Sequence, residues 1–202
     1  MLQVGLYLLL LCLLTKPMGL WINTVMTGEK HLLSRIGEPV ERFFYKLAGV
    51  DVNTEMTWKH YTIALMSFNI LGVIVVFLLQ KLQLTLPLNP QQFANISTDS
   101  AFNTAISFVT NTNWQGYGGE TTMSYFSQML GLAVQNFFSA ATGIVVVIAL
   151  IRGFARHSTQ TIGNFWVDLT RSTLYLLLPL SLLLATIFMS QGVIQNFDAY
   201  QN

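Results

Sequence analysis

The sequence predicts an all-α membrane protein, and its composition and charge distribution are the two observations behind that prediction. Apolar residues make up 52% of the 202 residues and charged residues only 9%, whereas soluble domains carry about 25% charged residues. The charges also cluster, leaving the uncharged runs Thr121–Ile151 and Ser172–Phe197, each long enough to cross a bilayer. A net charge of +1 without a basic stripe excludes a nucleic-acid binder, and the single Cys12 excludes a disulfide framework within the chain.

Four stretches have the length and apolar character of membrane-spanning helices. They are Leu2–Met26, Tyr61–Gln80, Thr121–Ile151 and Ser172–Ile194. Lys16 and Pro17 interrupt the first stretch, whose start resembles a secretory signal. Because no basic residue precedes it and no A-x-A site follows, we expect a retained span. A cleaved signal is the alternative. The third run exceeds the bilayer thickness, so part of it must tilt, bend or lie outside the hydrocarbon. Pro179 is expected to kink the fourth helix without ending it.

The distribution of basic residues predicts the orientation of these spans. The loops between spans one and two and between spans three and four together hold eight lysines and arginines, while the loop between spans two and three holds only Lys81. By the positive-inside rule, loops 27–60 and 152–171 are cytoplasmic, and both termini and the segment from Lys81 to Glu120 lie outside.

A short helix is expected inside the first cytoplasmic loop. Pro39 suits its first turn, Gly49 offers a stop, and apolar residues recur at helical spacing at Val40, Phe43, Phe44 and Leu47. This helix either lies on the inner leaflet or packs on a partner; an ordinary packing helix with solvated charges is the alternative.

The outer segment contains a second short helix signal. Ser97, Thr98 and Asp99 are N-cap candidates, and one apolar face follows, made of Ala101, Phe102, Ala105, Ile106, Phe108 and Val109. This face covers about nine residues, or about 13 Å, which is too short to cross a membrane. A short apolar helix between two spans is typical of a re-entrant pore helix; periodicity alone supports a surface helix equally well.

The polar, glycine-bearing stretch from Thr110 to Glu120 favours the pore helix. Irregular backbone at membrane depth is tolerated only where it is buried in protein or lines a wet cavity. There an extended strand can point successive carbonyl oxygens at a cation and replace its hydration shell, near the partly negative end of the preceding helix. Glu120 is a pore-mouth candidate that could concentrate cations, and a solvated helix-capping role is an equal alternative.

Other polar residues in the spans have two possible roles, ion contact and helix packing. Gln135 or Asn136 could lie near an ion path, but interhelical hydrogen bonds explain them as well, together with Asn69 and Gln128. Ser139 and Gly143 form a small-residue patch suited to helix packing. The single histidines His31, His60 and His157 lack metal-ligand spacing, so we expect no transition-metal site.

Three motifs carry a resemblance to a known family. They are SFVTNTNWQ-x-Y-x-GE at Ser107–Glu120, PLNPQQ at Pro87–Gln92 and SYFSQM-x-GL-x-VQNF at Ser124–Phe137. With them the chain closely resembles, from its first span to its end, the potassium-binding A subunit of the bacterial Kdp potassium-transporting ATPase. The resemblance implies that the first filter strand corresponds to six residues: Thr110, Asn111, Thr112, Asn113, Trp114 and Gln115.

The resemblance also implies an architecture and a set of partners. Four helix–pore-loop–helix repeats surround a pseudo-fourfold filter in this family. On that template residues 1–60 hold an extra helix and a cytoplasmic loop. Residues 61–151 form the first repeat. Residues 152–202 hold a cytoplasmic loop and the first helix of a second, incomplete repeat. The subunit would take potassium, its only ion, from outside the bacterial inner membrane. It would pass the ion to a P-type ATPase subunit that uses ATP, in a complex with accessory small membrane subunits.

The chain departs from that family in length. A complete A subunit is more than twice as long, so three of the four filter strands are absent from these 202 residues, and we expect this incomplete pore to bind potassium weakly or not at all alone. No P-loop or D-K-T-G motif is present, so we expect no ATP hydrolysis by the chain itself and no covalently bound cofactor. The alternative function is that of a non-transporting small membrane protein that scaffolds or regulates partner subunits.

Overall fold

Four long apolar helices dominate the fold, as the composition predicts. The computed structural model describes residues 2–156, 160–193 and 196–198. Each of the four helices is long and apolar enough to cross a membrane. They are α1 (Leu2–Thr27), α3 (Trp58–Leu82), the continuous helix Ser127–Ala155 and the continuous helix Phe165–Ser190. The described residues form no strand, so the all-α prediction is confirmed.

The third and fourth spans begin and end elsewhere than the uncharged runs suggest. The run from Thr121 first forms the short helix α5 (Gly119–Thr122) and then breaks, so part of it lies outside the long helix, as expected. The fourth span begins at Phe165 and not at Ser172, because the charged side chains of its first turns are internally paired and the helix can include them. The loop predicted at 152–171 is thus shorter, because the third span continues to Ala155 and the fourth begins at Phe165.

Two of the spans contain π-helical segments. The third consists of η1 (Ser127–Ala133) followed by α6 (Val134–Ala155), and the fourth of α7 (Phe165–Arg171), η2 (Ser172–Leu177) and α8 (Leu178–Ser190). Pro179 lies in the first turn of α8, directly after η2. Proline removes a backbone donor, and a π-bulge is one of the structures that accommodate such a disruption. The helix continues through Pro179, as predicted.

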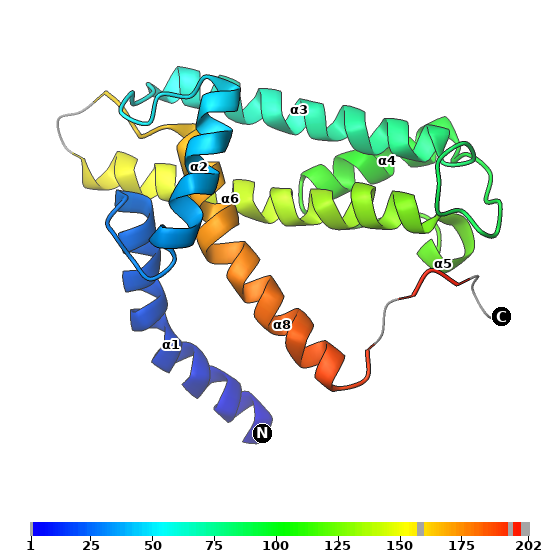
Figure 1. Ribbon diagram of the computed structural model, residues 1–202, viewed down its shortest axis with the longest axis horizontal. Helices are drawn as coiled ribbons and strands as arrows, with labels where there is room; N and C mark the ends of the chain where they lie inside the picture. The colour runs from blue at the N-terminus through cyan, green and yellow to red at the C-terminus, as the bar shows by residue number, and fades with distance from the viewer. Residues whose placement is uncertain (1, 157–159, 194–195, 199–202) are drawn as a thin grey trace.

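The four spans are not all parallel (Figure 1). α3 and α6 run side by side, with α4 (Thr98–Val109) beside them in the half of the molecule that holds α5, whereas α1 and α8 slant away from this group (Figure 1). One apolar core joins α3, α4 and η1; a second joins α3, α6 and α7; a third joins α1 to η2. The first core positions the outer segment between spans two and three.

The helix expected in the first basic loop is α2 (Ser34–Ala48). It begins five residues before Pro39, so the prediction that Pro39 lies in the first turn is wrong; Leu33 and the turn at His31 start the helix instead. The predicted stop is confirmed, since Gly49 adopts a left-handed φ of 65° and its N–H bonds the Tyr45 carbonyl.

Candidate functional site

α4 is the short helix that positions the polar loop. Its 12 residues span about 18 Å, too little to cross a membrane. Ala101 and Ala105 are fully buried, and they pack with Phe108 against Val76 of α3 and Leu132 of η1. Ser97 occupies the N-cap position, one of the three predicted. Because small residues line its buried face, α4 can lie close against α3.

Two buried glutamines at the end of α3 hold the outer segment in place. The Gln83 side-chain amide donates to the carbonyls of Ala94 (2.5 Å) and Thr122 (2.9 Å), and its Oε1 accepts from the Ser124 N–H (3.2 Å). Gln80 donates to the Ala101 carbonyl at 3.1 Å. Both side chains are at most 1% exposed. They satisfy irregular backbone groups that would otherwise be costly to bury.

Tyr117 ties the far end of the loop to the same framework. Its hydroxyl donates to Gln80 Oε1 at 2.9 Å and accepts from the Thr104 hydroxyl at 3.2 Å. Burial raises the pKa of the Tyr117 phenol, so the hydroxyl remains protonated and available as a donor at neutral pH. The loop between α4 and Tyr117 is therefore anchored at both ends.

The loop that follows α4 turns its N–H groups back toward one residue, Ser107. The Ser107 carbonyl accepts from the N–H groups of Thr112 (2.8 Å) and Asn113 (3.2 Å), and Ser107 Oγ accepts from the Trp114 N–H (2.5 Å). The sign of φ alternates along this stretch: it is negative at Thr110 (−82°) and positive at Asn111 (60°) and Asn113 (57°). Alternation of this kind makes successive N–H groups converge.

Within the part of the chain that the structure describes, the carbonyl oxygens of this loop are free of protein donors. Among the described residues, no hydrogen bond ends on the backbone carbonyl of any residue from Thr110 to Gln115. Five of these six residues are exposed and Gln115 is half-buried. The expectation of an extended strand is wrong, because left-handed φ values at Asn111 and Asn113 replace it; asparagine adopts that region more readily than most residues.

Two further residues border the loop. Ser139 of α6 is 4% exposed and donates to Asn111 Oδ1 at 3.3 Å, so it contacts the loop and is not simply part of a helix-packing patch. No atom of the described residues outside its own helix lies within 4 Å of where a Gly143 Cβ would be. Glu120 is exposed in the first turn of α5, a position that suits the capping alternative.

The polar residues of the spans mostly make local contacts. Gln128 donates to the carbonyls of Gly119 and Met123, which closes α5, and Asn69 donates to the Leu65 carbonyl of its own helix. Gln135 is buried, and its amide lies against Gly72 of α3: a Cβ added to Gly72 would lie 2.6 Å from Gln135 Oε1. Asn136 is exposed.

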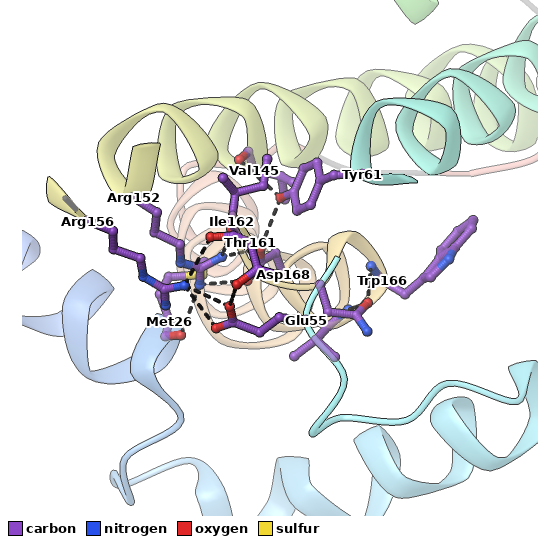
Figure 2. Close-up of polar contacts among 12 residues, drawn as sticks. Met26, Glu55, Tyr61, Val145, Arg152, Arg156, Thr161, Ile162, Trp166 and Asp168 are labelled. Carbon is purple, nitrogen blue, oxygen red and sulfur yellow. Dashed lines mark hydrogen bonds and ion pairs between the residues drawn. The ribbon is translucent and has the colours of Figure 1, made fainter. Parts of the chain in front are cut away.

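A buried ion pair joins the spans at their basic-loop ends. Arg152 of α6 donates to both oxygens of Asp168 of α7, with Nη1–Oδ2 at 2.5 Å and Nη2–Oδ1 at 2.9 Å (Figure 2). Arg152 also reaches the carbonyl of Met26 in α1, and the Tyr61 hydroxyl of α3 donates to Asp168 Oδ2 at 2.9 Å. Residues from all four spans thus meet at one charged pair.

A second, more exposed cluster lies beside this pair. Arg156 bonds both oxygens of Glu55, and the Thr161 hydroxyl donates to Glu55 Oε2 (Figure 2). The described residues, which include His31 and His60, form no cluster of three candidate metal ligands. His157 lies outside the described residues.

Sequence reasoning placed the loop but not the residues that support it. Ser107, Gln80 and Gln83 drew no interpretation, and both members of the Arg152–Asp168 pair were assigned to the loop 152–171. The signal that could have found the two glutamines is their position at the end of an apolar helix, next to an irregular segment whose backbone groups need partners.

These features define the class to which the chain belongs: a multi-pass, all-helical membrane protein with a short buried helix and a polar loop between its second and third spans. Comparison with known sequences is more specific. The family described as "Potassium-transporting ATPase A subunit" matches residues 5–202, and the chain belongs to this family.

Curated relatives agree with this membership. Proteins named "Potassium-transporting ATPase potassium-binding subunit" are 61% identical over 201 residues in Ralstonia pickettii and 62% identical over 202 residues in Chromobacterium violaceum. A protein of the same name from Herpetosiphon aurantiacus is 57% identical over 199 residues. These alignments cover 98–100% of the chain and 34% of each relative. The chain therefore spans about a third of the length of the relatives it matches.

Proposed function

We propose that the loop from Thr110 to Gln115 binds potassium as one segment of a carbonyl-lined filter, in the potassium-binding subunit of an ATP-driven uptake complex. The observation that carries this proposal is that, within the described residues, the carbonyls from Thr110 to Gln115 accept no hydrogen bond, while Ser107 holds three N–H groups of the same loop. Carbonyl oxygens replace the hydration shell of potassium in known filters. The relatives' name, potassium-binding subunit, supports the same ion.

The arrangement around the loop supports a re-entrant geometry. α4 is short, buried against α3 and η1, and followed by a loop that returns to α5 in the same half of the molecule (Figure 1). On this proposal residues 61–151 form one helix–pore-loop–helix repeat, preceded by an extra helix and followed by the start of a second repeat. The filter itself needs carbonyls from several such loops to surround an ion.

The charge distribution supports an orientation for this assembly. We place the loop and both termini outside the bacterial inner membrane and the two basic loops in the cytoplasm. The exposed Glu120 at the mouth would concentrate cations. ATP hydrolysis belongs to a partner, a P-type ATPase subunit, with accessory small membrane subunits completing the complex; potassium is the transported ion, and the chain itself is not an enzyme.

A chimera tests the filter assignment. In the Ralstonia pickettii relative, these 202 residues replace the matching third, and the protein is produced with the other subunits of that transporter in a bacterium deficient in potassium uptake. Thr112→Arg places a cation beside the free carbonyls and should raise the potassium concentration for half-maximal growth at least about tenfold by repulsion. Thr121→Arg, the same change in exposed α5, is the matched control. Equal growth of both variants and the parent would contradict the proposal.

A further inference from the structure

α2 is divided lengthwise into three faces of different chemistry. An inner face is buried and consists of Ser34, Gly37, Glu41 and Tyr45. An outer face is apolar and exposed, with exposed fractions between 37% and 74%, and consists of Ile36, Val40, Phe43, Phe44 and Leu47. A basic face, also exposed, consists of Arg35, Arg42 and Lys46. At 3.6 residues per turn these three sets occupy separate sectors of the helix.

The inner face fixes the rotation of α2 against the fourth span. The Tyr175 ring lies directly on Gly37, where a Cβ would come within 2.1 Å of Tyr175 Cε1. Glu41 Oε1 lies 3.8 Å from Nε of Arg171. Polar and small residues and Tyr45 therefore face the protein, while the phenylalanines and the aliphatic residues face outward. A surface helix of a water-soluble protein has the opposite arrangement.

We propose that the outer face of α2 lies in the bilayer, at the boundary between headgroups and acyl chains on the side of the two basic loops. The depth follows from the packing partners: Arg171 and Tyr175 both lie within the fourth span, Phe165–Ser190. In Figure 1, α2 lies across the direction of α3 and α6. A helix in this position is at the level of the lipid, not above it.

The basic face supports lipid as the occupant. An interfacial helix typically carries lysine and arginine on one face and phenylalanine or leucine on another. The long stems of Arg35, Arg42 and Lys46 can extend toward phosphate groups while the outer face remains in the acyl region. The inner face thus contacts protein, the outer face contacts acyl chains and the basic face contacts headgroups.

An apolar recess beside α2 adds a second observation. It has a volume of about 350 Å³ and opens between Phe44 and Leu47 of α2 and the side chains of Phe68, Phe138 and Trp166. Its lining is almost entirely apolar, so it suits an acyl chain and not water. The outer face is thus continuous with the apolar surface of the spans. This inference rests on the spans and on α2 packing, and it is independent of the potassium-binding proposal.

Nitroxide labels test where each face of α2 lies. In a Cys12→Ser background, single substitutions Phe43→Cys and Leu47→Cys report the outer face, and Arg42→Cys and Lys46→Cys report the basic face. The labelled chain is reconstituted in vesicles of phosphatidylethanolamine and phosphatidylglycerol at 3:1, with Leu71→Cys as a lipid-exposed reference and Asn53→Cys as a water-exposed one. Collisions with oxygen should exceed those with a water-soluble nickel complex severalfold at Phe43 and Leu47, as at Leu71, and the reverse should hold at Arg42 and Lys46.

Two outcomes would overturn the proposal. Labels at Phe43 and Leu47 that collide with the nickel complex as Asn53 does would place the outer face in water. Labels shielded from both reagents would place it under protein, either another segment or a partner subunit.

Labelling in cell membranes provides a second readout that does not depend on reconstitution. A membrane-impermeant maleimide added to everted inner-membrane vesicles should modify Arg42→Cys and Lys46→Cys at once, but Phe43→Cys and Leu47→Cys only after mild detergent. Rapid modification of all four before detergent, or none at Phe43 and Leu47 after it, would contradict lipid contact.

Discussion

Asn111 and Asn113 give the loop its backbone shape, and Ser107 holds that shape. Each asparagine has a positive φ, which costs most L-residues about 1–2 kcal/mol. Ser107 offsets this cost by accepting three N–H groups, and it is itself only 8% exposed. The backbone from Thr112 to Trp114 is thus a strained segment whose N–H groups are held by one buried residue, as is common at binding sites.

At the residue scale, this strain predicts a difference between two substitutions of Asn113. Asn113→Gly removes the cost of the positive φ and should leave potassium affinity within about twofold of the parent. Asn113→Val adds a β-branched side chain that disfavours the same φ, so the potassium concentration for half-maximal uptake should rise roughly tenfold or more. Rubidium-tracer uptake by the chimera measures both, and similar affinities for the valine and glycine variants would exclude a role for the alternating backbone.

At the element scale, the ion pair between Arg152 and Asp168 links the ends of the spans. Its side chains are 16% and 2% exposed, so breaking it leaves a charge in a largely dry site. Burying such a pair is costly in itself, so its structural role is measured by the loss of unfolding free energy when one partner is removed. The geometry is bidentate. The Tyr61 hydroxyl donates a further hydrogen bond to Asp168, and the Met26 carbonyl accepts one from Arg152.

Removing one partner should therefore destabilise the bundle. Asp168→Asn leaves Arg152 without its counter-charge and should cost about 3–5 kcal/mol. Glu38→Gln, which breaks the exposed pair with Arg42, is the control and should cost less than about 1 kcal/mol. Thermal unfolding of the detergent-solubilised chain compares the two variants. Equal shifts in Tm would show that the buried pair is not a structural link.

The Glu55 cluster predicts a pH dependence at the same end of the molecule. The Thr161 hydroxyl, followed by Arg156, lowers the pKa of Glu55 below its usual 4.5 in the folded state. A lowered folded-state pKa contributes stability above the unfolded pKa, and this stability is lost as the pH falls through the folded value. The Tm difference between the parent and Glu55→Gln should therefore be present at pH 6 and disappear between about pH 5 and pH 3.

The control for this pH profile is Glu29→Gln, an exposed carboxylate that forms no salt bridge among the described residues. Its Tm difference should be small throughout the range. A Glu55→Gln difference that grew on acidification would contradict the assigned sign.

At the scale of the whole molecule, the sequence predicted the spans and missed the contacts between them. Composition and charge clustering located four helices because apolar length is a local property. The start of the fourth span was misplaced because Asp168 and Arg171 look solvated in sequence, and only folding brings Arg152 and Glu41 to them. The backbone of the loop was also missed, since its left-handed φ values depend on Ser107 and not on residue type alone.

If the loop carbonyls bind potassium, an amide-to-ester change at one of them should weaken potassium binding. Replacing Gln115 in the chimera by its α-hydroxy acid weakens the Trp114 carbonyl as a ligand without deleting a side chain. The control is the same change at Leu88, which alters the Pro87 carbonyl in the same outer segment. Potassium affinity should fall severalfold with the ester at Gln115 and stay unchanged with the ester at Leu88. Unchanged affinity for both would show that this carbonyl does not bind the ion.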